Sequence, residues 1–180
     1  CILTKKDHKT GTDRIFEAYQ ELRDDNIEYV INLQGDEPML DIEDVNNLLK
    51  KTIKKKSKIS TLACLIEDEK FFLNKNVVKV TTKEELHQNN LSIATSFTRE
   101  IKNTQKNIYH HVGIYIYNVS YLERFVQLEQ TQNEKLQKLE QLRLMDNNIE
   151  IDVGLAKTKP IGVDTAEDYL EIKKIMEYKN

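Results

Sequence analysis

Apolar residues along the chain recur at two spacings, which predict helices and strands in alternation. Ile15, Ala18 and Leu22 fall three or four positions apart, the spacing of one helix face. Short apolar runs rich in β-branched and aromatic residues indicate strands instead. The helices predicted in this way cover residues 14–24, 41–56, 121–126, 134–145 and 165–178. The predicted strands cover residues 29–33, 59–66, 77–80, 92–97, 109–117 and 149–153.

This alternation predicts an α/β sandwich built on a mixed, mostly parallel sheet. No repeat, linker or low-complexity block divides the sequence, so we expect residues 1–180 to form a single domain. Asp41 and Thr165 are the predicted N-caps of the helices that follow them. Cys1-Ile2-Leu3 looks like a strand already under way, so we expect a further segment before Cys1.

Charge and composition narrow the class of protein. The chain has 27 Lys and Arg against 30 Asp and Glu, a net charge of −3, which excludes a globally basic nucleic-acid-binding protein. Its apolar runs are far shorter than the roughly 18 residues of a membrane span, and no hydrophobic signal segment is visible in these 180 residues. The two cysteines, Cys1 and Cys64, lack metal-ligand spacing. We therefore expect a soluble cytoplasmic protein that inserts into no membrane.

Two acidic residues are predicted to lie at the rim of the sheet. Asp36 follows a predicted strand within Gln34-Gly35-Asp36-Glu37-Pro38, and Asp164 precedes the last predicted helix. Ligands of α/β sheets bind beyond the carboxyl ends of strands, and Mg²⁺ commonly takes one or two carboxylates together with phosphate oxygens. Turn chemistry and helix starts explain the same residues without any metal. From the residues alone, a magnesium site and two solvated acids both stay open.

The predicted strand over residues 109–117 carries the second group of candidates. By the period of two, His111, Gly113, Tyr115 and Tyr117 share one face, and the opposite face is apolar and looks like the core side. A His and a Tyr on a polar face can bind sugar hydroxyls, but ordinary strand residues with hydrated tips fit equally well. The sequence Leu139-Glu140-Gln141-Leu142-Arg143 reads by itself as part of a core helix with a charged outer face.

Taken together, these segments resemble the family of 3-deoxy-manno-octulosonate cytidylyltransferases, the CMP-Kdo synthetases. Their motifs follow in the family's order and spacing over nearly all of the 180 residues. The matching motifs are Asp7-His8-x-Thr10-Gly11-Thr12-Asp13-Arg14, Asn32-Leu33-Gln34-Gly35-Asp36-Glu37-Pro38, Ser96-Phe97-x-Arg99, His111-x-Gly113-Ile114-Tyr115, Leu139-Glu140-Gln141-Leu142-Arg143 and Gly162-Val163-Asp164-Thr165-x-Glu167-Asp168.

The resemblance implies a Rossmann-like, glycosyltransferase-A-type nucleotide-diphospho-sugar transferase fold and a homodimer. It implies transfer of CMP from CTP to 3-deoxy-D-manno-octulosonate (Kdo), with release of pyrophosphate, for lipopolysaccharide biosynthesis. By matching position, Asp36 and Asp164 would be catalytic and would hold Mg²⁺. The residues matching the nucleotide site are Thr10, Gly11, Thr12, Arg14 and Gln34, and those matching the sugar-acid site are Arg99, His111, Tyr115, Glu140 and Gln141.

The family's sequences begin with a strand and a basic, Ser/Arg-rich loop that grips the triphosphate, and nothing in this chain matches them. We therefore expect that this first strand and loop are missing from the 180 residues, and that the fragment alone has little or no activity. Two alternatives remain beside the CMP-Kdo synthetase. One is a cytidylyltransferase for another 2-keto sugar acid, such as a sialic acid. The other is a non-catalytic remnant of the enzyme.

Overall fold

The computed structural model describes residues 1–35, 37–101, 106–158, 162–163 and 166–178. The helices are α1 (Gly11–Leu22), α2 (Ile42–Lys55), α3 (Glu69–Leu73), α4 (Val119–Gln127), α5 (Gln132–Gln137), α6 (Leu142–Asp146) and α7 (Ala166–Tyr178). The strands are β1 (Tyr29–Asn32), β2 (Ile59–Cys64), β3 (Lys79–Thr82), β4 (Leu91–Thr98), β5 (Ile108–Asn118) and β6 (Asp152–Leu155). Each predicted strand overlaps one of these, whereas α3 was not predicted.

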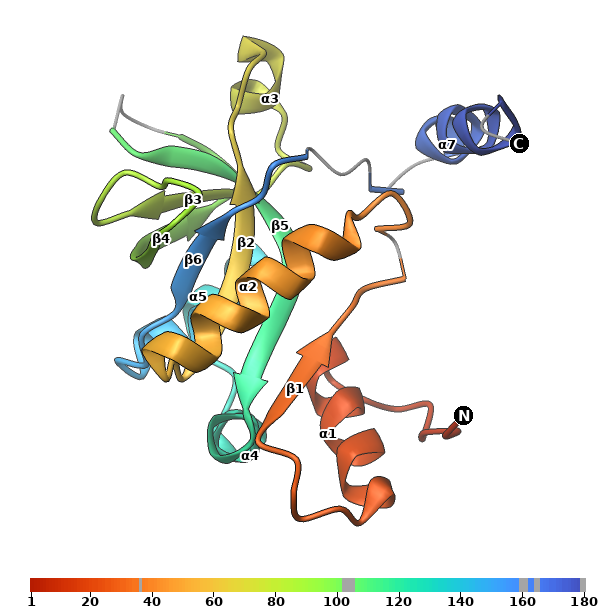
Figure 1. Cartoon of the computed structure of the whole chain (residues 1–180), viewed down its shortest axis with the longest axis vertical. Helices are drawn as coiled ribbons and strands as arrows, with labels where there is room; N and C mark the ends of the chain where they lie inside the picture. Colours follow the sequence, from red (N-terminus) through yellow and green to blue (C-terminus); the bar gives the residue numbers. More distant parts are fainter. Residues whose placement is uncertain (36, 102–105, 159–161, 164–165, 179–180) are drawn as a thin grey trace.

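The strands form one mixed sheet in the order β1-β5-β2-β6-β4-β3, in which β3 also pairs with β5 (Figure 1). The prediction of a mixed sheet is confirmed, but the prediction that it is mostly parallel is wrong. In the described part of the chain, only β2 and β6 pair in parallel, while β5 runs antiparallel to β1, β2 and β3. One physical reason lies in the connection between β3 and β4: residues 83–90 form no helix, and strands joined without a crossover helix pair antiparallel.

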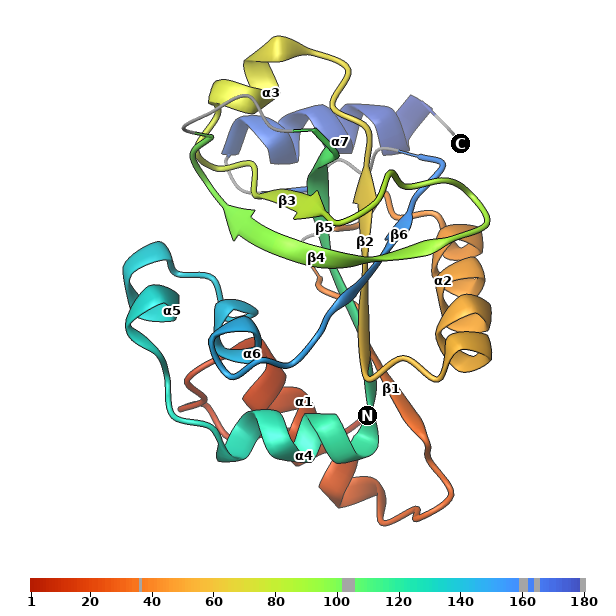
Figure 2. The ribbon, with the colours of Figure 1, turned by 90° about the vertical axis from the view of Figure 1, so that its left-hand side faces the viewer.

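Both faces of the sheet are covered by helices. Helix α2 lies on one face, and α1, α4, α5 and α6 lie on the other (Figure 2). On the α2 side, Val45 and Leu48 pack with Val112 and Ile114 of β5. On the opposite side, Tyr117 of β5 belongs to a larger cluster with residues of α4 and α6. Strand β5 is therefore covered on both faces, and most of its residues are buried in a low-dielectric environment.

Helix ends follow the local sequence where a cap is present. Asp41 is the N-cap of α2 as predicted, because its Oδ1 accepts a hydrogen bond from the Glu43 backbone N–H at 2.8 Å. The predicted single helix over residues 134–145 is wrong. It divides into α5 and α6 at Lys138, whose φ of 53° lies in the left-handed region. Cys1-Ile2-Leu3 forms no strand, and the predicted cap Thr165 lies outside the described residues.

Helix α7 follows β6 and stands to one side of the sheet (Figure 1). Among the described residues, no helix is both long enough and apolar enough to cross a lipid bilayer.

Gly154 of β6 offers a direct test of packing between the sheet and α2. A Cβ at this position would lie 2.9 Å from Leu48 Cδ1 and 3.1 Å from Leu91 Cδ2, both closer than ordinary contact. We expect Gly154→Ala to lower the free energy of unfolding by about 1–3 kcal/mol, the usual cost of overpacking a core. Urea denaturation measures the change.

Gly35→Ala is the matched control for this experiment. No atom lies within 4 Å of a Cβ built at Gly35, and its φ is not positive, so we expect a change within about 0.5 kcal/mol. An unfolding midpoint of Gly154→Ala equal to that of the unchanged protein would show that Leu48 and Leu91 can move aside.

Candidate active site

The N-terminus of α1 meets β5 and the turn between α5 and α6 at a buried hydroxyl. Thr12 is fully buried, and its Oγ1 donates a hydrogen bond to Glu140 Oε1 at 2.7 Å. The same Oγ1 lies 3.2 Å from the hydroxyl of Tyr117 on β5. Three segments far apart in the sequence therefore converge at one point, where Thr12 and Glu140 come from two of the matching motifs.

Gln34 extends this convergence to the end of β1. A Cβ built at Gly11 would lie 3.5 Å from Gln34 Nε2, and one built at Gly113 would lie 3.9 Å from Gln34 Cγ. The Gln34 side chain thus passes between two residues that have no side chain of their own. Of the residues matching the nucleotide site, the structure brings Gly11, Thr12 and Gln34 together.

Thr10 and Arg14 hold the backbone around this point. Thr10 is the N-cap of α1 and forms a reciprocal capping box with Asp13. Arg14 is exposed, and its Nη1 donates hydrogen bonds to Thr4 Oγ1 at 2.7 Å and to the Lys5 carbonyl at 2.9 Å. Arg14 therefore fastens the N-terminal segment to α1.

His111 and Tyr115 share the β5 face of Tyr117, but this face is buried rather than hydrated. His111 is 8% exposed, and its Nε2 lies 2.9 Å from Thr61 Oγ1. The pKa of His111 is lowered to about 3, mainly because the ring is buried and to a smaller extent because His110 is nearby. Burial also raises the pKa of Tyr115 well above its ordinary value. Near neutral pH both rings are uncharged, so they can act as hydrogen-bonding groups but not as ions.

Arg99, at the end of β4, lies beside the start of the α5–α6 turn. Its Nε donates to the Gln137 carbonyl at 3.2 Å, and its Nη1 donates to the carbonyls of Lys75 and Asn76 at 3.2 and 3.3 Å. Gln141 is buried in the same turn, and its own carbonyl accepts a hydrogen bond from the Leu144 backbone N–H at 3.2 Å.

A cavity of about 440 Å³ opens between α1 and the α5–α6 segment, a size suited to a small organic ligand. Its walls include Glu140 and the exposed Gly11, so the convergence at Thr12 borders open space. Three lysines, Lys9, Lys135 and Lys138, also line it and give it cationic groups.

A buried ion pair between Glu134 of α5 and Arg143 of α6 joins the two ends of the turn, and it was not predicted from the sequence. Arg143 donates to Glu134 through Nε at 2.9 Å and through Nη2 at 2.5 Å, and both side chains are at most 4% exposed. Burial by itself would raise the pKa of Glu134, but the hydrogen bonds from Arg143, Gln130 and the Thr131 backbone together with the charge of Arg143 outweigh it and lower that pKa. Arg143 also lies 4.2 Å from the centre of the Phe125 ring.

The two candidate metal ligands, Asp36 and Asp164, lie outside the described residues. In the part of the chain that the structure describes, no group of three or more His, Cys, Asp or Glu residues could hold a metal ion.

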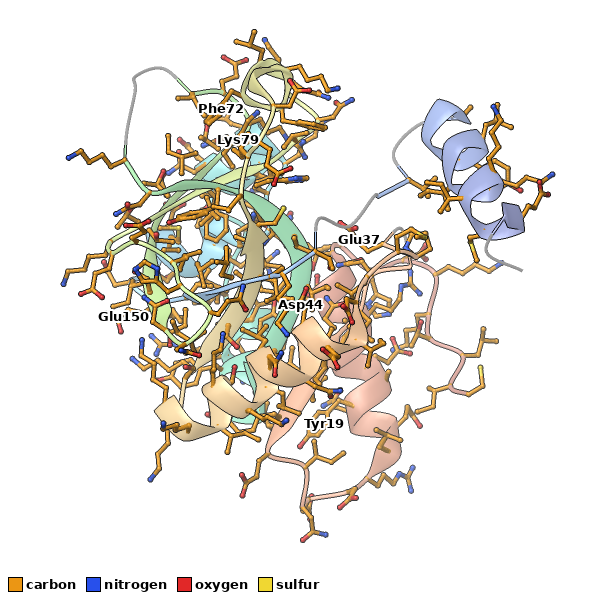
Figure 3. All side chains as sticks on the ribbon, turned by 45° about the horizontal axis from the view of Figure 1, so that its top comes forward. Tyr19, Glu37, Asp44, Phe72, Lys79 and Glu150 are labelled. Atoms are coloured by element: carbon orange, nitrogen blue, oxygen red, sulfur yellow. The ribbon has the colours of Figure 1, made fainter. Side chains whose placement is uncertain are left out.

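Asp44, labelled in Figure 3, lies in the first turn of α2 and binds the segment after β6. Its carboxylate accepts hydrogen bonds from the backbone N–H groups of Lys157 at 3.0 Å and Thr158 at 3.2 Å. Lys157 and Thr158, which follow β6, are therefore held at the start of α2. Asp164 comes six residues after Thr158 in the sequence. Asp41 in the α2 cap was identified from the sequence, but this tether was not.

The family model described as "Cytidylyltransferase" matches residues 1–151. A 3-deoxy-manno-octulosonate cytidylyltransferase of Thermodesulfovibrio yellowstonii is 40% identical, with 93% of this chain and 70% of that protein covered. The protein of the same name from Bartonella henselae is 36% identical, with 98% of this chain and 72% of that protein covered.

Solved structures show the same relationship in three dimensions. The structure of CMP:2-keto-3-deoxy-manno-octonic acid synthetase complexed with CTP superposes with a TM-score of 0.84 at 32% identity, covering 99% of this chain and 73% of that one. An apo UDP-glucose pyrophosphorylase has a TM-score of 0.68 at 14% identity, covering 99% of this chain and 63% of that chain, and shares the fold alone. The α/β fold predicted from the sequence is confirmed.

The lowered pKa of His111 predicts a pH dependence of stability. The unfolded chain takes up a proton on this residue below about pH 6.5, whereas the folded protein does so only near pH 3. Between these values the unfolded state binds more protons, so stability falls as the pH falls, by about 1.4 kcal/mol per pH unit. Between pH 7 and pH 4.5, we expect the unchanged protein to lose about 2–3 kcal/mol more than His111→Gln.

Urea denaturation at the two pH values measures this difference. His87→Gln, at an exposed position, is the control and should retain the pH dependence of the unchanged protein. Equal losses in His111→Gln and the unchanged protein would show that His111 is protonated in the folded state.

Proposed function

Because the chain belongs to the 3-deoxy-manno-octulosonate cytidylyltransferase family, we propose that it transfers CMP from CTP to Kdo, giving CMP-Kdo and pyrophosphate for lipopolysaccharide biosynthesis. The observation that carries this proposal is the convergence of Gly11, Thr12, Gln34 and Glu140 beside one cavity. In the reaction, the anomeric hydroxyl of the sugar attacks the α-phosphorus of CTP. The bond from that phosphorus to the bridging oxygen breaks, pyrophosphate leaves and the hydroxyl proton is released.

We assign the nucleotide to the side of Gly11 and Gln34. Gly11 is exposed and has no side chain, so a planar base can approach its backbone closely. The Gln34 amide next to it carries both a donor and an acceptor, which suits the edge of a pyrimidine base. Thr10 stabilises this surface by capping α1, and Arg14 stabilises it by binding the N-terminal segment at Thr4 and Lys5.

The sugar acid is assigned to the side of Glu140. Glu140 and Gln141 offer groups that hydrogen-bond hydroxyls, and the uncharged His111 and Tyr115 lie on the adjoining face of β5. We assign the sugar carboxylate to Arg99. Its Nε and Nη1 already bind carbonyls, so Nη2 is the part of the guanidinium assigned to the ligand.

We further propose that Asp36 and Asp164 hold Mg²⁺. Two carboxylates are a donor set that fits this hard cation, which completes its shell with phosphate oxygens and water. The hydrogen bonds from Lys157 and Thr158 to Asp44 support this proposal. They hold the residues that precede Asp164 in the sequence at the start of α2, and Asp36 precedes this same end of α2 in the sequence. When bound, the ion offsets the negative charge that develops as pyrophosphate leaves. The family resemblance also leads us to propose a cytoplasmic homodimer.

Pyrophosphate release by the whole protein with CTP and Mg²⁺ tests the function. We expect release that depends on Kdo, and much slower release when N-acetylneuraminate replaces Kdo at the same concentration. Faster release with N-acetylneuraminate would assign the enzyme to another 2-keto sugar acid. No release with either sugar would indicate a non-catalytic remnant.

The magnesium assignment is tested by Asp36→Asn and Asp164→Asn. We expect either change to reduce kcat at least about 100-fold, because metal charge stabilisation is worth several kcal/mol. Calorimetry should show weaker Mg²⁺ binding, which makes the test independent of turnover. Asp25→Asn, at an exposed position in the turn after α1, is the control and should match the unchanged protein. Normal Mg²⁺ binding by Asp36→Asn would remove Asp36 from the metal site.

A further inference from the structure

Tyr117 is a buried phenol that none of the assigned roles uses. It lies near the C-terminal end of β5, 1% exposed, with its ring 5.7 Å from Tyr115 and 6.4 Å from Phe125 between ring centres. Its hydroxyl reaches out of this aromatic packing to Thr12 Oγ1 at 3.2 Å. Packing against Tyr115 and Phe125 requires only the ring, so the hydrogen bond to Thr12 gives the hydroxyl a separate role.

The direction of the hydrogen bonds at Thr12 follows from the donors available. A threonine hydroxyl has one hydrogen, and an ionised carboxylate only accepts. Thr12 must therefore give its hydrogen to Glu140 Oε1, which lies at 2.7 Å. The Tyr117 hydroxyl must then donate to Thr12, and burial helps to keep it protonated by raising its pKa well above the ordinary value. The result is a one-way chain from Tyr117 through Thr12 to Glu140.

This chain holds one end of the cavity wall. The backbone N–H of Thr12 lies 3.5 Å from Glu140 Oε2, so both carboxylate oxygens face the first turn of α1. Glu140 itself stands in a short turn after the left-handed Lys138, where no helix hydrogen-bond ladder fixes it. Its rotamer depends on Thr12, and the orientation of the Thr12 hydroxyl depends on Tyr117.

We propose that Tyr117 is a positioning residue for the sugar-acid side of the site, acting through Thr12 to hold the Glu140 carboxylate in one orientation at the cavity wall. The inference rests on the proposed function, because that function assigns Glu140 to the sugar hydroxyls. A carboxylate held in advance loses less conformational freedom when the sugar binds. Tyr117 therefore affects the sugar acid rather than the nucleotide.

Tyr117→Phe tests this by removing the hydroxyl and keeping the ring. In the whole protein we expect the KM for Kdo to rise about 3- to 10-fold, the loss of roughly one hydrogen bond, while the KM for CTP changes less than 2-fold. Tyr109→Phe is the matched control. It lies on the same strand, and its buried hydroxyl accepts a hydrogen bond from the Leu86 backbone N–H at 2.8 Å. It should lower stability without changing the KM for Kdo.

A rescue series tests the link through Thr12. Thr12→Ser keeps the hydroxyl and should retain a KM for Kdo close to that of the unchanged protein, whereas Thr12→Val should raise it. In a Glu140→Ala background, Tyr117→Phe should have no further effect on this KM. Equal changes in both KM values, or an unchanged effect of Tyr117→Phe in Glu140→Ala, would overturn the proposal.

Thermal unfolding separates this inference from the proposed function, because it needs no turnover. We expect Tyr117→Phe to lower Tm by about 2–4 °C in the unchanged background and by less than half of that in Thr12→Val. Additive Tm shifts would overturn the Tyr117–Thr12 link even in an active enzyme. If no sugar supports pyrophosphate release, the proposed function fails, while non-additive Tm shifts would still support the link.

Discussion

Two charges that cannot reach water, those of Glu134 and Arg143, determine the shape of one wall of the site. Removing an ion from water costs several kcal/mol, so such a pair persists only when its hydrogen bonds are complete. Here Glu134 also accepts hydrogen bonds from Gln130 Nε2 and the Thr131 backbone N–H, and Arg143 lies over Phe125. In one continuous helix, residues nine positions apart would lie about 13 Å apart along the axis, so this ion pair requires the chain to turn between α5 and α6. Glu140 lies in that turn.

The opposite wall is built on a different constraint, the burial of β5 on both faces. An 11-residue strand with three antiparallel neighbours and helices on each side has no hydrated edge along most of its length. Its buried titratable side chains are therefore kept uncharged, as His111 shows, and the Thr61 hydroxyl is a hydrogen-bond partner for His111. Uncharged groups of fixed orientation are suited to sugar hydroxyls, because they need no reorganisation when the ligand arrives.

The sequence predicts most elements but not how they come together. The α2 boundaries and the Asp41 cap follow from local chemistry, which a sequence carries in full. The break at Lys138 does not, because Leu136, Leu139 and Leu142 have the spacing of one continuous helix. Leu136 is nonetheless 80% exposed, since the bond between Glu134 and Arg143 requires the chain to turn. Strand direction was also predicted wrongly, because the alternation of helices and strands did not reveal that residues 83–90, between β3 and β4, contain no helix.

A residue that matches a binding motif can contact the ligand directly, or it can position the backbone that contacts the ligand. The burial of its side chain distinguishes these two roles. Thr12 is fully buried with its hydroxyl committed to Glu140 and Tyr117, so its side chain has no atom left for a nucleotide. Gly11, one residue earlier, is exposed and presents bare backbone at the first turn of α1, where the helix dipole favours electron-rich groups. The two neighbours in one motif therefore have different surroundings. Gly11 lines the cavity, and Thr12 ties the first turn of α1 to Glu140 on the other wall.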